Sequence, residues 1–262
     1  MTAPAPIATF DLLGMPIAVL DTMGLLDHMF QSLQAGRGGW IITANLDFLR
    51  RHAHDPAARR LYAGADVRVA DGMPLVWAAR LQGTRLPERI AGASLMLPIA
   101  ERAARERRTL YLLGGEPGAN EKASAVLRAR WPELLICGAS SPMVGSPPTA
   151  ADLAILRDEV VRARPDILLV GLGSPKQEQL IEALRPDLPG AWMIGVGITF
   201  SFVAGTVARA PAWMQQTGME WCWRLAQEPR RLARRYLVED IPFSFELFAR
   251  AAWARMRSPR PS

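Results

Sequence analysis

Short apolar runs recur between residues 15 and 205, and most of them end at glycine or at a polar side chain. They lie at 16–20, 40–43, 67–70, 109–115, 134–138, 166–173 and 191–197. Runs of this length that are apolar at almost every position are typical of parallel strands with helices on both faces. Because stretches with helical spacing separate the runs, the pattern predicts an α/β fold with a mostly parallel sheet.

The pattern changes near residue 208, where the apolar runs stop. Before this point a helix is expected over 21–36, with Asp21 as its N-cap and Gly36 at its end. After it the spacing predicts only helices, over 214–227, 229–238 and 242–256. We therefore expect an α/β body over 1–208 and a helical appendage over 209–262.

The appendage carries most of the excess positive charge. The whole chain has a net charge of +6, and residues 209–262 hold ten arginines, five acidic residues and four of the eight tryptophans. Arginine beside tryptophan favours an anionic partner such as lipid headgroups, a diphosphate or nucleic acid; a solvated basic tail is the alternative. Nucleic acid ranks lower, because no nucleic-acid motif is present.

The cysteine content, the length of the apolar runs and the N-terminal sequence limit the classes to which this protein can belong. The two cysteines suit a reducing compartment and argue against a structural metal site. No apolar run approaches the roughly 18 residues that a membrane-spanning helix needs. The N-terminus has no basic residues before an apolar core, so we expect no secretory signal.

Polar or glycine-rich segments follow five of the predicted strands. They contain Thr43, Asn45 and Asp47; Asp71 and Gly72; Gly114, Gly115 and Glu116; residues 171–178; and residues 195–200. The carboxyl ends of parallel strands share one edge of a sheet, which is where ligands bind in such folds. Glycines there let backbone N–H groups approach a phosphate, so the sequence predicts a cleft at this edge.

Each candidate residue has a structural alternative. Asp71 is either a general base at a strand end or the N-cap of the next helix, and Asn45 either contacts a ligand or caps its helix. The segment around Gly171 and Gly173 lacks a dinucleotide fingerprint and a P-loop. Lys176 and Gln177, at the start of a helix, could reach a diphosphate or a sugar hydroxyl.

Two further patterns concern metals and anions. His52 and His54 lie two residues apart on a predicted helix, so they face different sides and argue against a metal site; no Asp-x-Asp follows any strand. Four appendage arginines surround Pro229: Arg224, Arg231, Arg234 and Arg235. Arg231 shares a helix face with either Arg234 or Arg235, and two guanidiniums on one face suit a diphosphate.

Taken in order, several segments resemble the WecG/TagA/CpsF glycosyltransferases from about residue 10 to residue 240. These segments are TANLDFL (43–49), ADGMPLVWAARLQG (70–83), PERIAGASL (87–95), LYLLGG (110–115), RPDILLVGLGSPKQE (164–178), GVGITFSFVAGTVARAP (195–211) and EWCWRLAQEPRRLARRY (220–236). The combination is specific, whereas any one segment alone is weak.

The resemblance implies a Rossmann-like body and an appendage that touches the membrane. It implies inverting, metal-independent transfer from a UDP-sugar to a polyprenyl-diphosphate-linked sugar, without a cofactor, by a cytoplasmic protein peripheral to the inner face of the cell membrane. The family's catalytic Asp falls on Asp71, and its other site positions fall on Thr43, Asn45, Arg89 and Gln177. The arginines that meet the acceptor diphosphate fall on Arg224, Arg231 and Arg234.

For the donor, we expect contacts from the glycine loops and their neighbours: Gly114, Gly115, Gly171, Gly173, Lys176, Gly195, Gly197 and Ser201. Ser201 departs from the family pattern, which commonly has Asp there, and this puts the choice of nucleotide or donor sugar in question. The alternatives are a nicotinamide-dependent oxidoreductase and a non-catalytic, membrane-associated nucleotide-binding protein. The sequence leaves open the donor sugar, the acceptor sugar, the polymer and the oligomeric state, a homo-oligomer included.

Overall fold

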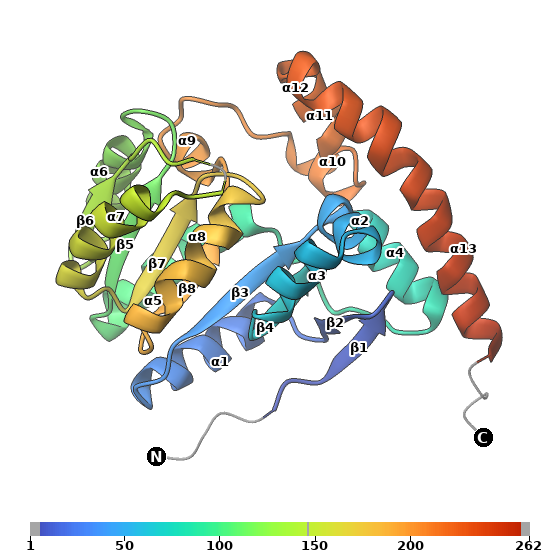
Figure 1. Cartoon of the computed structure of the whole chain (residues 1–262), viewed down its shortest axis with the longest axis horizontal. Helices are drawn as coiled ribbons and strands as arrows, with labels where there is room; N and C mark the ends of the chain where they lie inside the picture. Colours follow the sequence, from blue (N-terminus) through green and yellow to red (C-terminus); the bar gives the residue numbers. More distant parts are fainter. Residues whose placement is uncertain (1–5, 146, 258–262) are drawn as a thin grey trace.

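The computed structural model describes residues 6–145 and 147–257, and its centre is a six-stranded sheet (Figure 1). The strand order is β4-β3-β8-β7-β5-β6, and every neighbouring pair is parallel. The strands are β3 (Gly39–Ala44), β4 (Val67–Ala70), β5 (Thr109–Gly114), β6 (Leu135–Ser140), β7 (Ile167–Gly171) and β8 (Trp192–Gly195). The predicted α/β fold is confirmed.

Alternate residues of each strand enter two separate cores, one on each face of the sheet. In β7, Leu168 and Val170 face one core, while Ile167 and Leu169 face the other. The first core is covered by α2 (Leu46–His54), α3 (Pro56–Ala63), α4 (Met73–Gln82), α7 (Ala150–Ala163) and α8 (Lys176–Leu184). The second is covered by α1 (Thr22–Gln34), α5 (Gly92–Glu106), α6 (Ala119–Arg130) and α9 (Thr199–Val203). This double cover explains why the strands are apolar at almost every position.

The N-terminal strand predicted over 16–20 forms, but outside the main sheet. It is β2 (Met15–Ala18), paired antiparallel with β1 (Thr9–Leu12), a strand that the apolar pattern did not predict. The turn between them uses Leu13 and Gly14, both with positive φ, which matches a tight two-residue hairpin. As expected, Asp21 caps the next helix by accepting the Gly24 N–H at 2.8 Å.

The C-terminal helices differ from the predicted bounds. The helix expected over 214–227 is two helices, α10 (Ala212–Gln216) and α11 (Glu220–Gln227), separated at Gly218, whose φ is +75°. Conversely, α12 (Pro229–Ala233), the π-helical η2 (Arg234–Asp240) and α13 (Ile241–Arg257) follow one another without a gap. Pro242 lacks an N–H and would press on the carbonyl four residues before it, so a wider π turn fits there.

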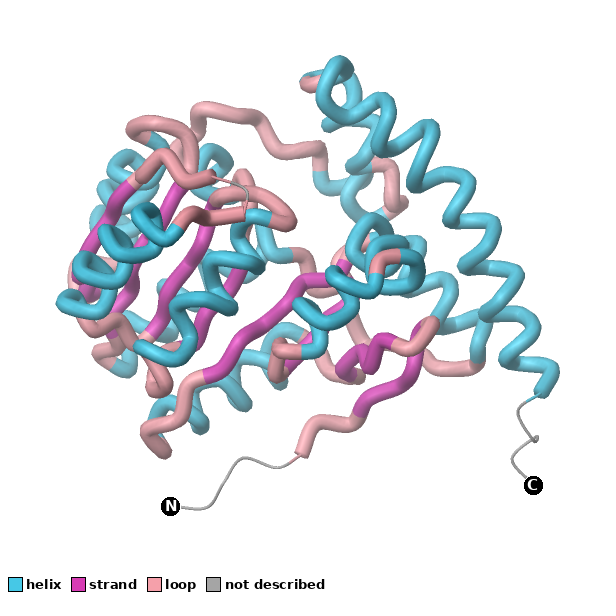
Figure 2. The backbone as a smooth tube through the Cα atoms, in the orientation of Figure 1, coloured by secondary structure: helices cyan, strands magenta, loops and turns pink. Residues whose placement is uncertain are grey.

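The appendage is joined to the body by a long irregular segment between α9 and α10, seen across the top of Figure 2. Its last helix, α13, packs along α4 and places Phe243, Leu247 and Ala251 in the first core. The boundary near residue 208 therefore marks a change of composition, and its status as a domain boundary stays a prediction. Among the described residues, no helix has the length and apolar character that crossing a membrane requires.

Candidate active site

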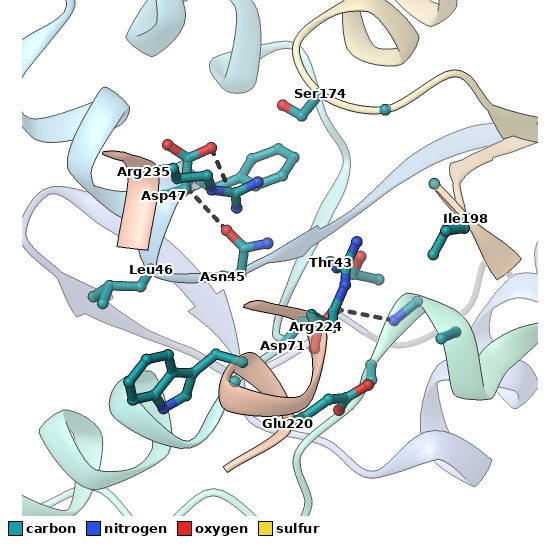
Figure 3. Close-up of a pocket in the computed structure, with 18 of the residues that line it drawn as sticks. Thr43, Asn45, Leu46, Asp47, Asp71, Ser174, Ile198, Glu220, Arg224 and Arg235 are labelled. Atoms are coloured by element: carbon teal, nitrogen blue, oxygen red, sulfur yellow. Dashed lines mark hydrogen bonds and ion pairs between the residues drawn. The ribbon is translucent and has the colours of Figure 1, made fainter. Parts of the chain in front are cut away.

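A cavity of about 790 Å³ lies at the carboxyl ends of β3, β4, β7 and β8 and beside the loop after β5, closed on the opposite side by the appendage. Figure 3 shows side chains from both parts directed into it. The sequence-predicted residues that line it are Thr43, Asn45, Asp71, Arg89, Gly115, Gly171, Gly173, Gln177, Gly195, Gly197, Ser201, Arg224 and Arg231. The topology thus brings together residues spread over almost 190 positions.

Asp71 does not cap α4, so the capping alternative is wrong. The N-cap of that helix is Gly72, with a φ of +134°. The Oδ2 atom of Asp71 instead accepts the N–H of Gly92, the first residue of α5, at 3.2 Å. Burial raises the pKa of Asp71 to about 6, while Arg89 and the Gly92 N–H act in the opposite direction. A carboxylate with this pKa is a good proton acceptor near neutral pH.

Arg89 links Asp71 to the appendage. Its Nη1 atom lies 3.9 Å from Oδ1 of Asp71 and 3.1 Å from Oε2 of Glu220, at the start of α11. Arg209, in the irregular segment, approaches the other oxygen of Glu220 at 3.7 Å. All four side chains are at most 24% exposed. Sequence reasoning missed Glu220 and Arg209, because neither follows a strand.

Thr43 and Asn45 lie at the end of β3, beside Asp71. Asn45 caps α2 by accepting the Phe48 N–H at 3.2 Å, so the capping alternative is confirmed, and it also lines the cavity. A Cβ on Gly92 would come within 2.9 Å of Oγ1 of Thr43. Glycine is therefore needed at the start of α5 for Thr43 and Asp71 to lie together.

Gln177 holds the loop that follows β8. Its Oε1 atom accepts the Gly197 N–H at 3.1 Å, and its Nε2 atom donates to Glu178 at 2.7 Å. Burial raises the pKa of Glu178. A Cβ on Gly195 would lie 2.4 Å from Nε2 of Gln177, so only glycine leaves room for this amide. The hydrogen bond between Gln177 and Gly197 thus fixes both the orientation of the amide and the position of the loop.

Most of the predicted donor-binding residues line the cavity, and two of them lie outside it. Gly115, Gly173 and Gly197 have positive φ and line the cavity, as loops that cradle a phosphate require. Ser201 also lines it, although the residue is only 1% exposed. Gly114 and Lys176 lie outside the cavity lining, and a Cβ on Gly114 would meet Leu172.

Of the three appendage arginines predicted to meet the acceptor diphosphate, two line the cavity and one does not. Arg224 and Arg231 line the cavity, and Arg231 is paired with Glu228. Arg234 lies outside the lining, with a side chain 86% exposed and 3.5 Å from Glu239. Arg235 lines the cavity instead.

Asp47 anchors Arg235 from the body (Figure 3). Its side chain is fully buried and contacts Arg50 at 2.7 Å, Arg51 at 2.5 Å and Arg235 at 3.4 Å. Arg235 also lies 3.6 Å from Asp240, five residues later, which a π-helix brings to the same side. Burial raises the pKa of Asp240 to about 6. In the sequence, the position of Asp47 after Thr43 and Asn45 was the only indication of this network.

The described residues contain no group of three or more His, Cys, Asp or Glu side chains able to hold a metal ion. His52 is buried, and His54 lies 3.0 Å from Glu246 of α13.

One family of known proteins matches this chain. The model described as "Glycosyl transferase WecG/TagA/CpsF family" matches residues 10–258, nearly the whole chain.

Proposed function

Because this chain belongs to the WecG/TagA/CpsF family of glycosyltransferases, we propose that it moves a sugar from a UDP-sugar to a polyprenyl-diphosphate-linked sugar. Membership in the family makes it a transferase that acts on a sugar donor and an acceptor. The proposal adds the two substrates, inversion at the anomeric carbon and independence from metal ions. It also adds peripheral attachment to the inner face of the cell membrane.

The observation that carries the proposal is the position of Asp71. This carboxylate lies in the cavity at the end of β4, with its pKa raised to about 6 and with Arg89 and Glu220 beside it. In the proposed reaction Asp71 accepts the proton of the acceptor hydroxyl. The hydroxyl oxygen bonds to the anomeric carbon as the bond from that carbon to UDP breaks on the opposite side.

Charge on the departing diphosphate needs donors fixed before the reaction. We assign this task to the loop at Gly173, which lines the cavity in a positive-φ conformation. Donors of this kind act in a partly enclosed site without reorganisation. The N–H groups of Gly115 and Gly197 already donate to the Gly171 carbonyl and to Gln177, so these two glycines shape the cavity. Thr43, Asn45 and Gln177 would orient the two sugars, and Arg224 and Arg231 would meet the acceptor diphosphate.

Exposed apolar side chains gather on α4 and on the appendage. Eleven of the large ones belong to this region: Trp77, Leu81, Trp213, Met219, Trp221, Leu237, Val238, Ile241, Phe245, Trp253 and Met256. Tryptophan and phenylalanine beside arginine suit the headgroup layer of an anionic membrane. This supports contact with the membrane, where a lipid-linked acceptor is held.

The test is a donor screen in EDTA. Purified protein would be incubated with UDP-, GDP- and TDP-sugars and a short-chain polyprenyl-diphosphate sugar, with product followed by mass spectrometry and its anomeric configuration by NMR. Transfer from one UDP-sugar with inversion supports the proposal. A folded protein that transfers nothing, or that binds NAD and not UDP by tryptophan quenching, refutes it.

A further inference from the structure

The position of Glu220 between two arginines suggests a task that the proposed mechanism does not use. Arg89 contacts both acids, but its Nη1 atom lies closer to Glu220, at 3.1 Å, than to Asp71, at 3.9 Å. Arg209 likewise approaches Glu220, at 3.7 Å, and donates through Nη2 to Ser94 at 2.9 Å. One carboxylate of the appendage therefore holds two guanidiniums whose charge acts on Asp71.

We propose that Glu220 is a positioning residue that keeps Arg89 and Arg209 from neutralising Asp71, so that Asp71 stays a competent base. This inference rests on the proposed function of Asp71. Glu220 touches Arg89 and Arg209, and it acts on the reaction through these arginines and through the direct effect of its own charge on Asp71.

The electrostatic argument follows from the groups that face Asp71. Positive charge comes from Arg89, in the loop before α5, and from Arg209 of the irregular segment; the Gly92 N–H of α5 adds a hydrogen bond. Glu220 supplies negative charge that acts against these groups. An opposite charge within about 4–6 Å lowers a carboxyl pKa by about 1–3. Without Glu220, two uncompensated guanidiniums would lower the pKa of Asp71 and weaken it as a base.

The residues around Asp71 come from two different parts of the chain. Asp71 and Arg89 belong to the body, whereas Glu220 opens α11 of the appendage. The same helix carries Arg224 and Trp221, which line the cavity. One helix of the appendage therefore both lines the cavity and acts on the basicity of Asp71.

The test compares Glu220→Gln with Glu246→Gln in the full-length protein. Glutamine keeps the size of the side chain and an oxygen for Arg89, but removes the charge. Glu246 is the matched control, because it is an ion-paired acid of α13 that lies outside the cavity, 2.8 Å from Arg250. The pKa of Asp71 would be read directly by carboxyl NMR of protein labelled at aspartate, with Asp71→Asn identifying the signal.

We expect Glu220→Gln to lower the pKa of Asp71 by about one pH unit or more, and Glu246→Gln to leave it unchanged. The acid limb of the pH–rate profile should move down by the same amount, with a few-fold lower kcat on the plateau. In an Arg89→Gln background the shift caused by Glu220→Gln should shrink. An unchanged Asp71 pKa in folded Glu220→Gln, or an equal shift in both backgrounds, overturns the proposal.

The NMR titration does not depend on turnover. If the wild-type protein transfers no sugar but the Asp71 pKa still responds to Glu220, the proposed function fails while the electrostatic arrangement stands. If transfer occurs and the titration does not respond, the reverse holds.

Discussion

The carboxylate of Asp71 accepts a hydrogen bond from the backbone N–H of Gly92, which opens the 15-residue helix α5. The N-terminal end of a helix stabilises negative charge, so this contact favours the ionised carboxylate while burial opposes it. The balance leaves the pKa near 6. Several measurable properties depend on that balance.

Replacing Asp71 with asparagine should remove transfer and keep the fold. Loss of a positioned general base costs about 10²–10⁴-fold in rate, and the amide keeps the size of the side chain. The measurement is kcat together with the circular dichroism spectrum. Asp158→Asn, on an exposed face of α7, is the control and should retain full activity. Wild-type turnover by a folded Asp71→Asn protein would exclude Asp71 as the base.

The same substitution should stabilise the protein at neutral pH. A carboxyl whose pKa rises on folding, from 3.8 to about 6, destabilises the folded state above pH 6 and has no effect well below pH 3.8. At about 1.4 kcal/mol per pH unit, the gain for Asp71→Asn is at most about 3 kcal/mol, and less because the side chain is 24% exposed. Urea unfolding at pH 8 and pH 4.5 measures it. A gain that did not shrink at the lower pH would contradict this origin.

Activity should depend on the ionisation of Asp71. The base must be deprotonated, so kcat/KM should rise as pH passes through about 6 and then level off. Initial rates in EDTA across pH 5–8 would give the midpoint. A rise that began near pH 4 would mean that the ordinary pKa persists in the working enzyme.

Asp47→Ala should destabilise the protein strongly. The buried carboxylate is shared by Arg50, Arg51 and Arg235. Its removal takes the carboxylate partner from Arg51, whereas Arg50 and Arg235 keep Asp240. Breaking a buried ion pair from one side costs about 3–5 kcal/mol. Urea unfolding against Asp158→Ala, whose partner Arg162 is exposed, supplies the comparison. Equal stability of the two variants would mean that the network adds nothing.

Gly195→Ala should disturb the cavity through Gln177. The new Cβ would lie 2.4 Å from Nε2 of Gln177, so the amide must move and release the Gly197 N–H. We expect a large loss of transfer and weaker UDP binding by calorimetry. Gly190→Ala is the control, since only the Gly36 carbonyl lies near its Cβ, at 3.8 Å. Normal UDP affinity in Gly195→Ala would place the nucleotide elsewhere.

The parts of the molecule that could be predicted are those with a local signal. Buried parallel strands are apolar at almost every position, and the segments after them share one edge of the sheet, so the body and most of the cavity followed from the sequence. Asp71 and Gln177 were found for this reason. The family resemblance then supplied Arg89, which follows no strand.

Contacts between residues that are far apart in the sequence could not be predicted, because no local pattern marks them. Nothing in the sequence around Glu220 distinguishes it from other acidic residues in a basic helix, and its contact with Arg89 depends on the tertiary structure. Arg231 shares an α-helical face with both Arg234 and Arg235, so periodicity alone could not choose between them. The choice depends on η2, where residues five apart lie together. Strand β1, and with it the hairpin, was missed because its four residues, TFDL, form no continuous apolar run and are too few to show a period.

The π segment also constrains the length of the chain. Because α12, η2 and α13 are contiguous, the wide turn takes up one residue more than an α-helix would need for the same rotation. If the segment closed into an α-helix at its present length, every later residue would rotate by about 100° around the axis. Phe243, Leu247 and Ala251 would then leave the core against α4. Deleting one residue within 234–240 would instead let the turn close with the later residues on their present faces, so this segment should accept a deletion that an ordinary α-helix would not.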